Sequence, residues 1–103
     1  MAKPPKHSSL IQAIHTAVIS GGYVFTGHAL KRVSEREVSQ PEVEQVLTTG
    51  YHEKSKDEFK EEFQSWNYAI RGKTVDSREL RVAVTFDSGM LVVTVIDLSK
   101  QGD

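Results

Sequence analysis

The hydrophobic residues of this chain change their period near Gly50, and this change restricts the fold more than any other feature. Before Gly50, apolar residues recur every three or four positions, which is the spacing of helices with one buried face. After Gly50, apolar and polar residues alternate, which is the spacing of half-buried strands. A helical half followed by a stranded half predicts an α+β domain.

Three helices are predicted in the first half, and each has a recognisable start or stop signal. Thr26 is a natural N-cap for the second helix, and Ser39 with Glu42 forms a capping-box pattern that opens the third. The expected ranges are from Ser8 or Ser9 to Gly21, from about Gly27 to Arg36, and from Ser39 to Gly50, with a short β-type run at Tyr23–Phe25.

The second half predicts an antiparallel sheet of about four strands. Alternation over residues 65–70 and 80–86 indicates two half-buried strands, and Asp87-Ser88-Gly89 is typical of a hairpin turn leading to a final, interior strand at Met90–Leu98. Residues 51–56 add an edge strand, and the acidic segment 57–62 is interpreted as a solvated loop. Two or three helices are expected to cover one face of the sheet and to leave the other partly exposed.

Length and charge limit the domain count and the partners. A chain of 103 residues with no second compositional region predicts one domain over residues 8–98, a flexible leader at 1–7 and a tail at 99–103. The longest apolar run is too short to cross a membrane, so no interaction with a membrane is predicted. The net charge of -1 gives no global attraction to nucleic acid, so an RNA site must be a local patch. The absence of cysteine excludes thiolate zinc sites and cysteine nucleophiles, and it favours a cytoplasmic location.

The strongest candidate site is a basic stripe on the second helix. His28, Arg32 and Arg36 follow one another at four-residue steps and share one helix face at the border of its buried arc. An imidazole beside two guanidinium groups suits a site that binds a phosphate and moves a proton. The alternative is an ordinary solvated face, because Glu35 is within reach of both Lys31 and Arg32.

The remaining candidates lie on the predicted strands. Trp66 and Tyr68 share a strand face with apolar residues, so they are either core aromatics or a base-stacking platform. Arg71 and Arg81 have the opposite parity and belong to the other face or to an edge. No histidine has metal-ligand spacing with another histidine or acid, so no metal and no cofactor is predicted.

Two stretches of the sequence resemble a known family. The first is His28-Ala-x-x-Arg32-x-x-x-Arg36 with the helix start that follows, and the second is Asn67-Tyr-Ala-Ile70 with Arg78-Glu-Leu-Arg-Val-Ala-Val84. Over about residues 25–98, they resemble a widespread bacterial domain-of-unknown-function family that is distantly similar to RelE-like and MqsR-like mRNA interferase toxins.

The resemblance implies a RelE- or barnase-like fold and a toxin-like endoribonuclease that needs no metal. His28 would then be the base for the ribose 2′-hydroxyl, Arg32 and Arg36 would stabilise charge on the phosphate, and Tyr68 would be a stacking or acid group. Further contacts to RNA are expected from Lys31, Trp66, Arg71 and Arg81. An antitoxin-like protein is the expected partner. The alternatives are a protein-interaction module without catalysis and an RNA-binding domain without catalysis.

Overall fold

The computed structural model describes residues 3–100 and confirms the α+β class. Residues 1–2 of the predicted leader and residues 101–103 of the predicted tail lie outside the described residues. The elements are the helices α1 (Leu10–Ser20), α2 (Gly27–Glu35) and α3 (Gln40–Thr49), and the strands β1 (Tyr23–Phe25), β2 (Tyr51–His52), β3 (Glu58–Lys60), β4 (Ser65–Lys73), β5 (Glu79–Phe86) and β6 (Met90–Asp97). Short 3-10 turns follow β2, β3 and β6.

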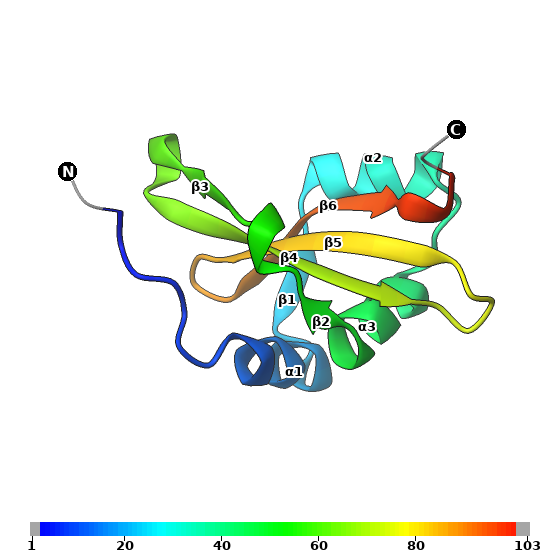
Figure 1. Cartoon of the computed structure of the whole chain (residues 1–103), viewed down its shortest axis with the longest axis horizontal. Coiled ribbons are helices and arrows are strands. Elements are labelled where there is room, and N and C mark those ends of the chain that lie inside the picture. Colours follow the sequence, from blue (N-terminus) through cyan, green and yellow to red (C-terminus); the bar gives the residue numbers. More distant parts are fainter. Residues whose placement is uncertain (1–2, 101–103) are drawn as a thin grey trace.

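The sheet has the order β1-β6-β5-β4-β2, and β3 pairs separately with β4 (Figure 1). The prediction of about four antiparallel strands was therefore wrong in two respects. Residues 3–100 contain six strands, and the short ones, β1, β2 and β3, have only two or three residues each. The sheet is mixed, because β1 runs parallel to β6 while the other pairs are antiparallel.

The predicted loop at residues 57–62 was also wrong, because it contains β3. Glu58, Phe59 and Lys60 pair with Asn67, Trp66 and Ser65, so β3 and the start of β4 form a two-stranded arm. Phe59 is the only apolar residue of β3, and its ring meets the Trp66 ring edge-on with centroids 5.4 Å apart. The contact between Phe59 and Trp66 thus stabilises β3, although the composition of this segment is typical of a loop.

The starts of α2 and α3 follow the predicted caps, whereas Ser9, the N-cap residue of α1, makes no capping hydrogen bond with its side chain. The Oγ1 atom of Thr26 accepts a hydrogen bond from the Ala29 amide at 3.1 Å, and Ser39 and Glu42 form the complete capping box. Such caps satisfy amides that would otherwise have no partner in the first turn. Thr26 therefore fixes where α2 begins, and His28 is the second residue of that helix.

The core lies on one face of the sheet, between β4, β5 and β6 and the helices α1 and α3. Alternate residues of each strand face this layer, as the period of two predicted. They pack against apolar residues of α1 and α3. The buried members are Leu10, Ile14, Ala29, Val38, Val43, Val46, Leu47, Tyr68, Ile70, Leu80, Val82, Val84, Met90, Val92 and Val95.

Helix α2 is placed differently from α1 and α3, since it runs alongside β6 (Figure 1). β1 pairs with the first residues of β6, and the chain then turns at Thr26, whose amide donates to the Val92 carbonyl at 3.0 Å. A β-bulge beside this turn leaves Val93 without a partner in β5. The N-terminus of α2 therefore projects beside the sheet face that α1 and α3 leave open. No helix within residues 3–100 has the length and hydropathy needed to cross a bilayer.

Candidate functional site

His28 is exposed and lines a groove with a volume of about 920 Å³. The groove crosses the open face of the sheet from the N-terminus of α2 to the β3–β4 arm. Most of its lining residues are polar, but apolar atoms form the larger part of its surface. The lining residues are Thr26, His28, Glu58, Lys60, Glu62, Phe63, Gln64, Ser65, Asn67, Thr85, Phe86, Asp87, Leu91, Val93 and Thr94.

Arg32 contacts His28 directly, one helical turn away. Its Nε atom lies 3.4 Å from Nε2 of the imidazole. A guanidinium group only donates hydrogen bonds, so Nε2 is the acceptor and carries no proton in this arrangement. The Nη1 atom of Arg32 also forms an ion pair with Glu35 at 2.8 Å. His28 and Arg32 of the predicted stripe are thus in contact. The guanidinium of Arg32 is also bound to the Glu35 carboxylate of the same helix.

Arg36 does not join the other two. It is the C-cap residue of α2, and it is not among the groove residues. Its carbonyl oxygen accepts a hydrogen bond from Nη1 of Arg78 at 3.2 Å, while its own Nε atom is buried without a hydrogen-bond partner in residues 3–100. Lys31 is exposed on α2 and also lies outside the groove lining.

Tyr68 and Trp66 lie on the helix-covered face of the sheet, away from His28. Tyr68 is only 6% exposed, and its hydroxyl accepts a hydrogen bond from the His7 amide at 2.9 Å. The indole Nε1 of Trp66 donates to the carbonyl of Pro4 at 2.9 Å. The sheet separates both rings from the groove, so neither contributes to a site built around His28.

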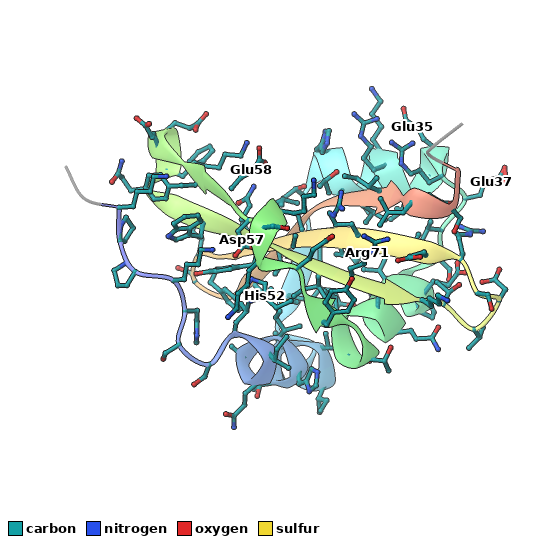
Figure 2. The ribbon with its side chains drawn as sticks, viewed as in Figure 1. Glu35, Glu37, His52, Asp57, Glu58 and Arg71 are labelled. Atoms are coloured by element: carbon teal, nitrogen blue, oxygen red, sulfur yellow. The ribbon has the colours of Figure 1, made fainter. Side chains whose placement is uncertain are left out.

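Arg71, which is labelled in Figure 2, and its register partner Arg81 lie on the open face, where an ion-pair network holds them. Nη1 of Arg71 lies 3.1 Å from Oε2 of Glu53, and Nε of Arg81 lies 2.7 Å from Oε1 of the same carboxylate. Arg71 also pairs with Glu79. The hydrogen bonds from Arg71 to Glu79 and Glu53 raise the pKa of its guanidinium. The hydrogen bond from Arg81, reinforced by Arg71, lowers the pKa of Glu53 against the opposing effect of burial.

Arg81 also lines a second hollow, of about 370 Å³, that continues from the groove. The groove and the hollow share Glu58, Asn67 and Thr94. The open face therefore carries a continuous depression with His28 near one end and Arg81 near the other. Arg71 lines neither part.

Sequence reasoning missed the groove residues of the arm, namely Glu58, Lys60 and Asn67. These residues alternate with Phe59 and Trp66, which would have placed them on the opposite face of a strand. Phe59 is the only apolar residue among several acids, so the sequence did not identify that strand. Within residues 3–100, no group of three histidines or acids is placed to hold a metal ion.

The family model described as Domain of unknown function (DUF4258) matches residues 25–97. The chain belongs to the DUF4258 family. None of the curated proteins and none of the solved structures gives a significant match.

The DUF4258 match agrees with the expected resemblance to an uncharacterised domain family over about residues 25–98. It covers α2, α3, β2 to β6 and every residue that lines the groove. It leaves out α1 and the segment before it. The relation to RelE-like and MqsR-like toxins stays a prediction.

Proposed function

We propose that this DUF4258 protein is a small toxin-like endoribonuclease that cleaves RNA by general acid–base chemistry in the groove beside α2. The observation that carries the proposal is the exposed imidazole of His28 in that groove, with the Arg32 guanidinium 3.4 Å from its unprotonated Nε2. An accessible ring nitrogen without a proton is a base that works near neutral pH. The adjacent guanidinium is suited to the charge of a phosphodiester.

The proposed reaction uses the ribose 2′-hydroxyl as the nucleophile. The Nε–H of Arg32 turns from Nε2 of His28 to the phosphate, and Nε2 then takes the 2′ proton while the 2′ oxygen forms a bond to phosphorus. The bond from phosphorus to the 5′ oxygen breaks, and that oxygen receives a proton from the Lys60 ammonium, which lines the same groove. Arg32 and Lys60 stabilise the additional negative charge on the phosphate oxygens in the transition state. The products are a 2′,3′-cyclic phosphate and a free 5′-hydroxyl.

This assignment changes the predicted catalytic set. Tyr68 is replaced by Lys60 as the acid, because Tyr68 is buried on the other face. Neither Arg32 nor Arg36 lines the groove; Arg32 is kept because it contacts His28, and Arg36 is left out because it has no such contact within residues 3–100. Oε1 of Glu58 lies 3.4 Å from Nζ of Lys60, and this ion pair keeps the ammonium beside the groove.

The test is cleavage of a single-stranded RNA by the purified full chain. His28→Ala should lower the rate by about 10²–10⁴-fold, the range for the loss of one acid–base group. His15→Ala is the matched control, because His15 lies on α1 and lines no part of the groove. A 2′-O-methyl RNA should resist cleavage, while a chelator should leave the rate unchanged.

Two results would overturn this proposal. One is cleavage of the 2′-O-methyl RNA, since that substrate has no 2′-hydroxyl to attack. The other is equal activity of His28→Ala and wild type. Salt-dependent binding of RNA without cleavage would instead identify an RNA-binding domain.

A protein-interaction module without catalysis is the second candidate function. The ion pair between Arg32 and Glu35 favours it, because a guanidinium engaged in its own helix is less available to phosphate. The carboxylates of Glu58, Glu62 and Asp87 in the groove would attract a basic protein segment. In that case a partner should bind wild type and His28→Ala equally, and Glu62→Gln with Asp87→Asn should weaken binding. An antitoxin-like partner of the enzyme would also cover the groove, but it would abolish RNA cleavage when bound.

A further inference from the structure

The segment Lys3–His7, called here the N-terminal strap, packs along the β3–β4 arm (Figure 1). The arm comprises residues 58–67, and its two faces carry different side chains. Phe59 and Trp66 face the strap. Glu58, Lys60 and Asn67 face the groove. The strap therefore touches the back of the groove wall.

The strap is suited to this contact by its sequence, Lys-Pro-Pro-Lys-His. Proline fixes its own backbone angle and restricts the residue before it to extended conformations, so the two prolines keep the segment extended with little loss of entropy. The Pro4 carbonyl accepts a hydrogen bond from Nε1 of Trp66 at 2.9 Å. Extended proline segments are recognised in this way by aromatic surfaces that supply an indole donor.

Two lysines of the strap lie over the aromatic rings of the arm. Nζ of Lys6 is 4.6 Å from the centre of the Trp66 ring. Nζ of Lys3 is 5.4 Å from the Trp66 ring and 5.6 Å from the Phe59 ring. Cation–π contacts at these distances favour the docked strap.

Lys6 is also a charge partner of a buried carboxylate at the base of the arm. Asp57 has a side chain that is 1% exposed, and its Oδ2 atom lies 2.9 Å from Nζ of Lys6 and 2.8 Å from Nε2 of His52. Its Oδ1 atom accepts the Ala69 amide at 2.9 Å, between the β4 residues that pair with β2 and those that pair with β3. Figure 2 shows His52 and Asp57 at this junction. A buried charge needs such partners, so Lys6 supports the point from which the arm extends.

The arm needs this support, because it is a two-stranded ribbon. β3 has a strand partner on one side only, and a two-stranded hairpin alone is at most marginally stable in water. We propose that the N-terminal strap is an intramolecular clamp that holds the β3–β4 arm in place and thereby sets the position of the groove wall. The clamp concerns the shape of the groove and is independent of the reaction that takes place there.

The first test uses Trp66, which is the only tryptophan of the chain. Quenching of its fluorescence by acrylamide reports whether the strap covers it. Lys6→Gln in the full chain removes the contacts to Asp57 and to the ring, and should at least double the quenching constant. Lys54→Gln is the matched control, because Lys54 is an exposed lysine of the neighbouring 3-10 turn. Equal quenching of Lys6→Gln and wild type would contradict the clamp.

The second test is amide hydrogen exchange, which separates local opening from global unfolding. In Lys6→Gln, the arm amides of residues 58–67 should exchange about tenfold faster. This factor corresponds to a loss of stability between that expected for an exposed ion pair and that expected for a buried one. Amides in β5 and β6 should exchange as in wild type. Equal acceleration in all strands would show a general loss of stability and would refute a local clamp.

Trp66→Phe gives a second variant that keeps an aromatic ring but removes the hydrogen bond to Pro4. It should accelerate exchange in the arm in the same way, and an unchanged arm would count against the clamp even if Lys6→Gln failed to fold. Neither measurement needs catalytic activity. Failure of the endoribonuclease proposal therefore leaves the clamp to be judged on its own data.

Discussion

Gly50→Ala should destabilise this protein far more than an ordinary substitution of glycine by alanine. Gly50 lies at the end of α3, where the chain passes directly against β4. An added Cβ atom would lie 2.5 Å from the carbonyl oxygens of both Arg71 and Val46. Both are backbone atoms, and Gly72 packs against Gly50 from the opposite strand, so no side chain can turn away to make room.

The size of the effect follows from this geometry. Non-bonded contacts of carbon are most favourable near 3.5 Å, so the end of α3 would have to move by about 1 Å from β4. Overpacking in a well-ordered core costs about 1–3 kcal/mol, and a clash with two fixed carbonyls belongs at the upper limit, about 3 kcal/mol. For a domain of this size, that loss lowers the melting temperature by about 15 °C.

The assay is urea and thermal unfolding followed by circular dichroism, with Gly27→Ala as the control. A Cβ atom at Gly27 would meet nothing within 4 Å, and alanine is the better helix former, so this variant should change stability by less than about 1 kcal/mol. The steric reasoning is refuted if Gly50→Ala melts within a few degrees of wild type, or if the two variants lose the same stability.

Three further predictions concern the site and its supports. Glu53→Gln should cost about 2 kcal/mol in urea unfolding at neutral pH, because it weakens charged hydrogen bonds to Arg71 and Arg81. The folded pKa of Glu53 lies below its unfolded value, so its contribution is present above about pH 4.3 and is lost as the pH falls through the folded pKa. The difference between wild type and Glu53→Gln should shrink in acid, and a constant difference would contradict this assignment. Thr26→Ala should lose the cap of α2, at about 1 kcal/mol in urea, and should also lower RNA cleavage, because the cap fixes the turn that carries His28. Ser39→Ala should cost a similar amount but leave cleavage unchanged, because α3 does not line the groove; equal cleavage rates in these two variants would argue against a positioning role for Thr26.

Local signals in the sequence were sufficient to predict the helices and the face of each long strand. Thr26 and the Ser39–Glu42 box marked helix starts, because a cap acts within four residues and depends on no distant contact. The parity of Trp66 and Arg71 placed these side chains on opposite faces of β4, which the structure confirms. Alternation along one strand is enough for that prediction.

Distant contacts account for what the sequence did not predict. β3 is held by Phe59 against Trp66, and the strap by contacts between residues 62 positions apart, such as Pro4 with Trp66. A helix period also predicts which residues share a face, but it does not determine what lies opposite. His28 and Arg32 came together as expected, whereas Arg36 fell at the cap, where α2 ends. Tyr68 was excluded from the site only by knowledge of which face α1 and α3 cover.

The parallel pairing of β1 with β6 determines when the groove can form during synthesis. The turn that carries His28 is held to β6 by Thr26, whose Oγ1 atom donates to the carbonyl of Val93, 67 residues later. The floor of the groove also comes from β6, through Leu91, Val93 and Thr94. Contacts this far apart in sequence form late in folding, because the intervening chain must first be closed into a loop. A nascent chain that has not yet released β6 from the ribosome therefore has His28 but no groove, so that chain cannot itself cleave RNA at the proposed site.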